Sequence, residues 1–196
     1  YLKNAESYGL SLEKADKNFK SVIERSRNVA KTMSKGVTFL MKKNKISVFN
    51  GFGKLGKENT IHITDSKKNE TVIHSEKIII STGARSRELP NVVQDGEKVI
   101  GYREAMNLKN QPKKLTIIGS GAIGIEFAFF YNSMGTEVTV IEYLDRIIPN
   151  EDEDISRELE KILSKKGVKI IKSSSVKKTE IKDNEVEGNL CIKYPW

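Results

Sequence analysis

The chain has 196 residues, of which 37% are hydrophobic and 31% charged, and its formal net charge is +8. This hydrophobic fraction excludes an intrinsically disordered chain, and no run approaches the roughly 18 apolar residues of a membrane span. Residues 1–110 carry 21 Lys and Arg against 12 Asp and Glu, whereas residues 111–196 carry 13 against 14. A nucleic-acid interface would need a basic patch on one face with interleaved aromatic residues. Here the lysines are scattered along polar faces, so we expect a solvated surface and no nucleic-acid partner.

One cysteine, Cys191, and two histidines, His62 and His74, limit the available chemistry. A single thiol forms no disulfide within the chain, and two histidines are too few for a histidine-based metal site. Low cysteine usage is typical of a reducing compartment, and the residues from Tyr1 onward show no signal peptide. We therefore expect a cytoplasmic protein with no metal and no membrane partner, whose sequence starts inside a longer chain.

The first half predicts a long helix followed by strands. Apolar residues recur at three- and four-residue intervals over residues 11–44, which predicts a helix. A short strand is expected at 46–49, and the alternating segments 59–64 and 70–74 predict a β-hairpin. The apolar run Lys77-Ile78-Ile79-Ile80 predicts a buried strand.

A polar connection over residues 84–111 separates this half from a regular alternation of strand and helix. Gly135 and Gly167 are positioned to end the two helices. Strand, helix, strand, helix and strand in succession predict a parallel α/β arrangement. The expected elements are strands at 115–118, 137–142 and 168–171 and helices at 125–134 and 152–166.

The glycine motif Gly119-Ser120-Gly121-Ala122-Ile123-Gly124 lies between the first of these strands and the first helix. This strand–turn–helix context is what gives the spacing its meaning as a dinucleotide-binding fingerprint. Gly119 permits the tight turn, Gly121 lets a pyrophosphate approach the backbone, and Gly124 lets the helix pack against the strand. The helix would then present its N–H groups to the phosphates, with an apolar face of Ile123, Phe127, Phe130 and Met134.

An acidic residue, Glu142, closes the second strand 21 residues after Gly121. A carboxylate there accepts hydrogen bonds from adenosine ribose hydroxyls and repels a 2′-phosphate, which favours NAD over NADP. Arg146 weakens this preference because an arginine can accept that phosphate, and a solvent-facing strand end is the alternative for Glu142. Glu126, one turn into the helix, is interpreted either as a partner of the helix dipole or as a nicotinamide-side contact.

Five segments together resemble the dihydrolipoyl dehydrogenases, a family of flavin disulfide reductases. They are residues 33–37, 51–55, 80–85, 119–126 and 138–142. The resemblance extends from about residue 1 to 187 and implies the central part of an enzyme with two Rossmann-like nucleotide-binding domains. Residues 1–111 would be the C-terminal part of an incomplete FAD domain with a β-hairpin insertion, and residues 112–196 an NAD domain incomplete at its C-terminus.

The resemblance also assigns cofactor-binding residues. Gly53 would lie against the FAD adenosine, Thr82 and Gly83 beside the flavin, and Val176 near the adenine of NAD. Gly119, Gly121, Gly124, Glu126 and Glu142 match the family's NAD site. From the residues alone, Gly53 is a bulge or hairpin glycine, Thr82-Gly83 a strand exit and Val176 a core residue.

The family's reaction implies partners for the protein, and it requires residues that this sequence does not match. Electrons pass from dihydrolipoyl groups on the acyltransferase of a 2-oxo acid dehydrogenase complex, through a disulfide and FAD, to NAD, in a homodimer. The family's first glycine fingerprint, redox cysteine pair and acid–base histidine are not matched in the sequence, so no catalytic residue is assigned.

We therefore expect NAD binding without turnover. A non-catalytic NAD-binding module and another flavin disulfide reductase, of mercuric or glutathione type, are the alternatives. Residues 188–196 resemble nothing expected of the family at this point and are interpreted as an altered, truncated or frame-shifted tail.

Overall fold

The computed structural model describes residues 11, 16–90, 92–182 and 185–192. The chain separates into two compact units: one comprises Tyr1–Arg25 with Ser86–Trp196, and the other comprises Ser26–Arg85. Helix α1 (Phe19–Lys43) begins in the first unit and continues into the second. None of the helices in the described part of the chain combines the length and the apolar character that a membrane span requires.

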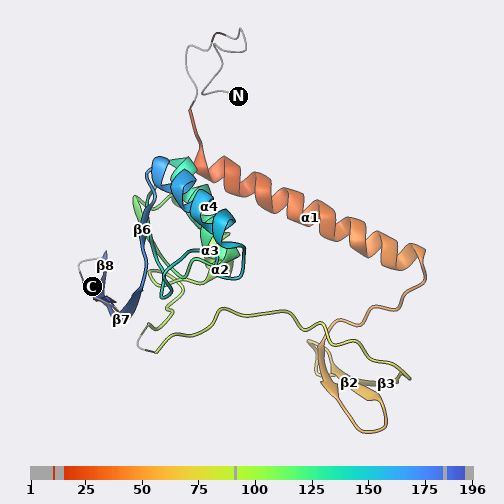
Figure 1. The fold of residues 1–196 in the computed structure, drawn as a ribbon. Coiled ribbons are helices and arrows are strands. Elements are labelled where there is room, and N and C mark those ends of the chain that lie inside the picture. Colours follow the sequence, from red (N-terminus) through yellow and green to blue (C-terminus); the bar gives the residue numbers. More distant parts are fainter. Residues whose placement is uncertain (1–10, 12–15, 91, 183–184, 193–196) are drawn as a thin grey trace. The chain divides into compact units, whose positions relative to one another are not determined.

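A parallel three-stranded sheet forms the centre of the first unit (Figure 1). Strands β4 (Lys114–Ile118), β5 (Glu137–Ile141) and β6 (Lys169–Ile171) lie side by side in that order. The register places Ile117 opposite Val140 and Ile141 opposite Ile171. The predicted strand alternation is confirmed.

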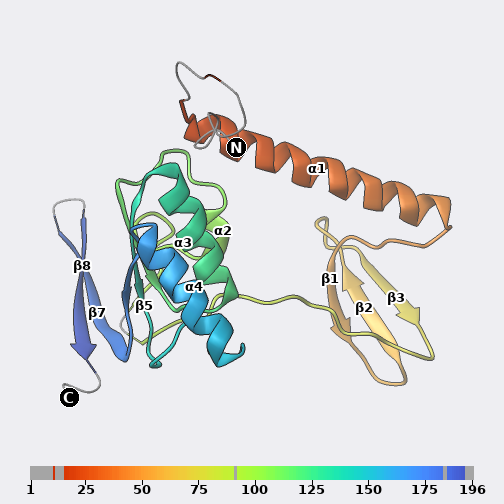
Figure 2. The ribbon, with the colours of Figure 1, turned by 45° about the horizontal axis from the view of Figure 1, so that its top comes forward.

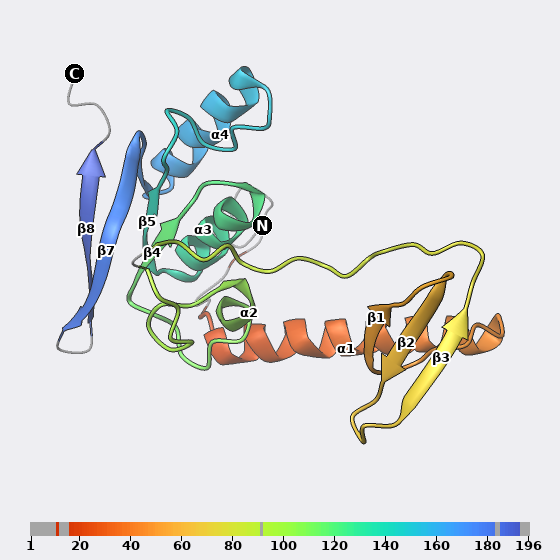
Figure 3. The same cartoon turned by 90° about the horizontal axis from the view of Figure 1, so that it is seen from below.

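Helix α3 (Ala122–Met134) connects β4 to β5, and α4 (Glu153–Lys165) connects β5 to β6. Figures 2 and 3 show both helices on the same side of the sheet. Successive right-handed crossovers in the same direction produce this arrangement. Gly135 ends α3 with a φ of 101°, a left-handed cap that a residue without Cβ adopts without strain.

The buried stripe of α3 differs from the predicted one. Ile125, Ala128 and Tyr131 face the core, whereas Ile123 is 57% exposed. Phe127, Phe130 and Met134 are partly buried against the same core. Because α3 is apolar nearly all round, its sequence pattern does not select one face.

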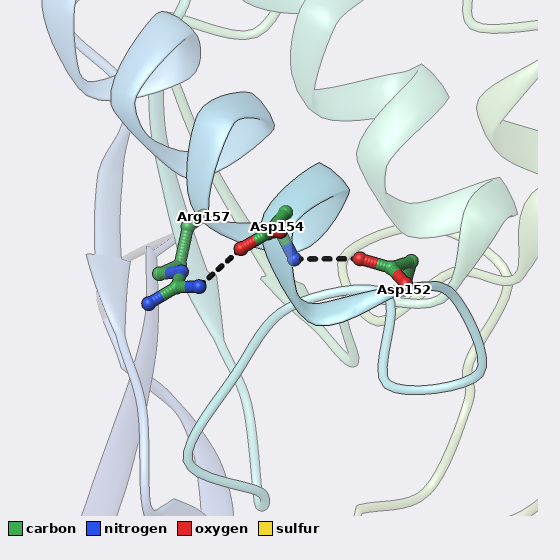
Figure 4. A network of polar contacts seen from close by, with 3 residues as sticks. All are labelled: Asp152, Asp154 and Arg157. Atoms are coloured by element: carbon green, nitrogen blue, oxygen red, sulfur yellow. Dashed lines mark hydrogen bonds and ion pairs between the residues drawn. The ribbon is translucent and has the colours of Figure 1, made fainter.

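Helix α4 has a capped and charged first turn (Figure 4). The carboxylate of Asp152, its N-cap, accepts a hydrogen bond from the backbone N–H of Asp154 at 2.9 Å. The side chain of Asp154 pairs with Arg157, and this hydrogen bond raises the pKa of the guanidinium. Acidic groups at this end complement the helix dipole.

The beginning of α1 packs on α3. The ring centroids of Phe19 and Tyr131 are 6.0 Å apart, and both side chains are buried. The Tyr131 hydroxyl donates to the carbonyl of Ala105 at 2.6 Å, at the end of the short helix α2 (Tyr102–Ala105). Burial raises the pKa of Tyr131 to about 12.

Helix α1 begins at Phe19 and not at residue 11 as predicted. The side chain of Asn18 accepts a hydrogen bond from the N–H of Ser21 at 2.9 Å, which is the geometry of an N-cap. Ser11 lies outside the helix, and residues 12–15 lie outside the described residues. The helix starts later than predicted because its cap is Asn18, directly before the first residue of the apolar pattern, Phe19.

An antiparallel hairpin follows the parallel sheet. Strand β7 (Ser174–Lys182) pairs with β8 (Glu185–Ile192), and a register shift occurs between Val176 and Lys178. Residues 188–192, which were interpreted as part of an altered tail, form most of β8. Residues 193–196 lie outside the described residues.

The second unit contains an antiparallel sheet, visible in Figure 2. Its strands are β1 (Phe52–Leu55), β2 (Thr60–Thr64) and β3 (Glu70–His74). The predicted hairpin is confirmed by β2 and β3, and β1 adds a strand that the sequence did not predict. The strands predicted at 46–49 and 77–80 do not form: Ile79 is 90% and Ile80 66% exposed.

Candidate functional site

The glycine turn between β4 and α3 is tightly constructed. Gly119 has a φ of 99°, a left-handed conformation that glycine adopts freely, and its N–H donates to the carbonyl of Ile141 at 2.8 Å. A Cβ on Gly124 would overlap the carbonyl oxygen of Gly119 and would lie 3.4 Å from the side chain of Ile117. Gly119 and Gly124 therefore bring the start of α3 against the end of β4.

The N-terminus of α3 is open. Gly121 is its N-cap, no side chain caps the helix, and no acidic residue occupies its first turn. A Cβ built on Gly121 would meet nothing within 4 Å. Backbone N–H groups in the first turn of a helix have no partner within the helix, and together with the dipole they attract an anion. This end of α3 has the backbone geometry of a phosphate site.

Glu142 lies beside this turn and is 7% exposed. Its Oε2 accepts hydrogen bonds from the N–H of Ser120 at 2.8 Å and from the Ser120 hydroxyl at 2.6 Å. Its Oε1 accepts from the N–H of Leu144 at 2.8 Å. The carboxylate is therefore directed into the turn, in contrast to the solvent-facing alternative considered from sequence.

The segment between β5 and α4 closes over the turn. The N–H of Ile148 donates to the Ser120 carbonyl at 2.9 Å, and the hydroxyl of Ser156 donates to the Ile147 carbonyl at 2.6 Å. Arg146 donates through Nη2 to the carbonyl of Pro149 at 2.7 Å. Sequence reasoning did not predict the partnership of Ser120 with Glu142, although Ser120 stands inside the fingerprint.

The remaining residues predicted for the NAD site lie in different surroundings. Glu126 and Ala122 are exposed on α3, and Ile123 lies in its first turn. Val176 is partly buried on β7, where it pairs with Leu190. The structure places Ser120, Gly121, Gly124 and Glu142 around one turn, while Val176 belongs to the following hairpin.

The residues predicted for FAD lie in the second unit and are exposed. Gly53 lies on β1 opposite Ile63, and a Cβ there would make only an ordinary contact, 3.7 Å from Ile61. Thr82 and Gly83 lie in an irregular segment, where Gly83 has a φ of 79°. These three positions alone do not enclose a flavin.

A second segment, residues 51–56, has the same glycine spacing as residues 119–124 and includes strand β1. It leads into an antiparallel partner strand and not into a helix, so it offers no helix N-terminus to a phosphate. His62 and His74 are exposed on β2 and β3. In the described part of the chain, no three His, Cys, Asp or Glu side chains are grouped to hold a metal ion.

Comparison with known sequences matches residues 3–192 to the family described as pyridine nucleotide-disulphide oxidoreductase. The chain is 39% identical over 190 residues to a dihydrolipoyl dehydrogenase of Zymomonas mobilis, with 97% of the chain and 41% of the relative aligned. A dihydrolipoyl dehydrogenase of Rhizobium etli is 43% identical over 89% of the chain and 40% of the relative. The chain thus spans about two fifths of the length of these relatives, and the family match includes β8.

Solved structures agree with this match. LpdA from Mycobacterium tuberculosis superposes with a TM-score of 0.86 at 25% identity, over 96% of the chain and 42% of that protein. The HOCl-induced flavoprotein disulfide reductase RclA from Escherichia coli gives 0.73 at 29% identity, over 88% and 39%. The predicted α/β fold class with Rossmann-like sheets is confirmed.

Proposed function

Because the chain belongs to the pyridine nucleotide-disulphide oxidoreductase family, we propose that residues 112–196 form the NAD(H)-binding part of a dihydrolipoyl dehydrogenase. The observation that carries this proposal is the uncapped N-terminus of α3 beside the buried carboxylate of Glu142. The turn would hold the pyrophosphate against backbone N–H groups, and Glu142 would accept from the adenosine ribose.

Selection of NAD over NADP follows from charge. A 2′-phosphate next to the carboxylate of Glu142 would be repelled, and a basic group would be needed to offset this. Arg146 is the nearest candidate in sequence, but its guanidinium is partly buried and donates to the carbonyl of Pro149. Both observations favour NAD.

The proposal extends to the full-length protein. It would bind FAD with contributions from Gly53, Thr82 and Gly83 in residues 1–111 and would act as a cytoplasmic homodimer. It would pass electrons from dihydrolipoyl groups of a 2-oxo acid dehydrogenase complex, through a disulfide and FAD, to NAD. FAD supplies the two-electron relay between thiols and nucleotide, while protein residues bind and orient it.

The 196 residues themselves would bind nucleotide without turnover. They contain one cysteine, Cys191, which lies on β8 and pairs in register with Ser175. A dithiol relay needs two thiols. Oxidation of dihydrolipoamide with NAD by the purified chain, above a no-protein control, would contradict this part of the proposal.

The binding site is tested with a pair of glycine substitutions. Gly121→Ala has room for its Cβ in the free protein but places a methyl group where the pyrophosphate would approach. We expect it to raise the Kd for NADH at least tenfold, measured by nucleotide fluorescence, without lowering Tm. Gly36→Ala, also without neighbours within 4 Å and remote in sequence, is the matched control and should leave the Kd unchanged.

The choice of nucleotide is tested in the same titration. The unmodified chain should bind NADH more tightly than NADPH, and Glu142→Gln should reduce this preference because it removes the negative charge. Equal affinity for both nucleotides would contradict the assignment of Glu142, and absence of saturable binding would contradict the proposed function as a whole.

A further inference from the structure

The carboxylate of Glu142 already has most of its hydrogen-bonding capacity in use. An ionised carboxylate offers about four lone-pair positions, and three are occupied here. Two of the donors belong to Ser120 and act on Oε2, and the third is the N–H of Leu144 on Oε1. One acceptor position, on Oε1, is left for a ligand.

The backbones on both sides of this contact are fixed. The N–H of Glu142 donates to Ile171 at 2.8 Å, and its carbonyl accepts from the N–H of Ser174 at 2.9 Å. The carbonyl of Ser120 accepts from Ile148 at 2.9 Å, and Ser120 is completely buried. The Ser120 N–H therefore cannot leave Oε2 without breaking the turn, whereas its hydroxyl can rotate about χ1.

A ribose with free 2′ and 3′ hydroxyls presents two adjacent donors. For one carboxylate to bind both hydroxyls, each of its two oxygens must have a vacant acceptor position. Since Oε2 already accepts twice, the second ribose hydroxyl must replace the Ser120 hydroxyl, whose 2.6 Å contact has the length of a charge-assisted bond.

We propose that the Ser120 hydroxyl competes with the adenosine ribose for Glu142, and that Ser120 thereby sets the nucleotide affinity of this site. This inference rests on the proposed function, because it requires the ribose to lie at Glu142. Ser120 is a specificity-determining residue in this proposal: it weakens the advantage of a ribose diol over a ribose with one hydroxyl.

Ser120→Ala removes the competing hydroxyl and leaves the backbone N–H donor in place. We expect NADH to bind roughly three- to tenfold more tightly to this variant, because the ribose no longer has to displace the hydrogen bond from the Ser120 hydroxyl to the Glu142 carboxylate. Its Tm without nucleotide should fall, because Glu142 loses a partner in the free protein. Unchanged or weaker NADH binding by a folded Ser120→Ala chain would overturn the inference.

Thr136→Val is the matched control. Thr136 is also buried, and its hydroxyl donates to the carbonyl of Pro112 at 2.8 Å, next to the opposite end of β5. The variant loses a buried hydroxyl without touching Glu142, so its Tm should fall and its affinity for NADH should not change. A similar gain in affinity in Thr136→Val would show that loosening the fold causes the effect, and would overturn the inference.

The unmodified chain provides a test that does not depend on a folded variant. ADP-ribose and its 2′-deoxy analogue should bind within about threefold of each other, because the bond gained from the second hydroxyl is offset by the bond lost from Ser120. In Ser120→Ala the two ligands should separate by about tenfold. A difference above tenfold in the unmodified chain would overturn the inference alone, whereas failure to bind either ligand or NADH would overturn the proposed function.

Discussion

Two glycines of one turn serve different purposes, and substitution separates them. Gly124 is required by packing, because a Cβ would overlap the Gly119 carbonyl, whereas Gly121 faces open space. We expect Gly124→Ala to lower the free energy of unfolding by about 1–3 kcal/mol, the usual cost of overpacking. Gly121→Ala should leave it nearly unchanged in the same denaturant titration. Equal losses in both variants would contradict the distinction.

Tyr131 couples the core of the first unit to pH. Its hydroxyl is buried against Ala105, and burial raises its pKa to about 12 from the ordinary value of 10.0. Because the folded pKa is the higher one, its contribution to stability is complete below about pH 10 and is lost as pH rises toward 12.

Tyr131→Phe removes both the hydrogen bond and the titrating group. The variant should be less stable by about 1 kcal/mol at pH 8. The difference from the unmodified chain should shrink between pH 10 and 12, which paired denaturant titrations at pH 8 and pH 11 would measure. A constant difference across this range would exclude Tyr131 as the source of the pH dependence. Pairing the two chains removes the contribution of lysines, which titrate in the same range in both.

Among the elements, α4 depends on its cap. Asp152 immediately precedes the helix, and its carboxylate accepts a hydrogen bond from the N–H of Asp154 in the first turn. Replacing an N-cap residue of this kind by alanine costs about 1 kcal/mol. Asp152→Ala should lower the free energy of unfolding by this amount, while Asp152→Asn keeps an acceptor and should lose only a fraction of it. If the two variants were equally destabilised, the charge and not the hydrogen bond would be the cause.

The elements differ in how far their own sequence determines them. Helix α4 and strands β4 to β6 were predicted because glycine stops and apolar spacing agree within each segment. The apolar run at residues 77–80 has the composition of a buried strand, but a strand also needs partners, and none pairs with it among the described residues. Strand β1 was missed because one glycine and one lysine among its four residues give it little strand propensity. Its pairing with β2 decides the outcome.

In the candidate site, too, the sequence predicts some features and not others. The fingerprint and the acid after β5 were recognisable because their spacing along the chain reflects a fixed βαβ geometry. The hydrogen bonds from Ser120 to Glu142 were not, because they depend on side-chain directions across 22 residues. The string at residues 51–56 has the same glycine spacing without the helix, which shows that context and not spacing carries the prediction.

At the scale of the whole molecule, the two units differ in how much apolar surface they bury. Ile63 is the one buried residue of Ser26–Arg85, all of which the structure describes, whereas the first unit has a core with Ala128, Tyr131 and Val138 fully buried. Local stability follows buried apolar contacts. We expect amide hydrogen exchange in β1 to β3 to be faster than in β4 to β6, and uniform protection across both units would contradict this.

The exposed apolar side chains of the second unit lead to a concentration-dependent prediction. Phe52, Ile79 and Ile80 are 76%, 90% and 66% exposed, and exposed apolar surface favours association. We expect the purified chain to self-associate, and Ile79→Ser with Ile80→Ser to shift it toward the monomer in sedimentation velocity. Ile155→Ser removes a side chain that is 59% exposed on α4 and is the matched control, because it lies in the first unit. A chain that stays monomeric would contradict the predicted association, and a single cooperative unfolding transition would contradict the lower stability of the second unit. Both predictions follow from the small amount of apolar surface that Ser26–Arg85 buries.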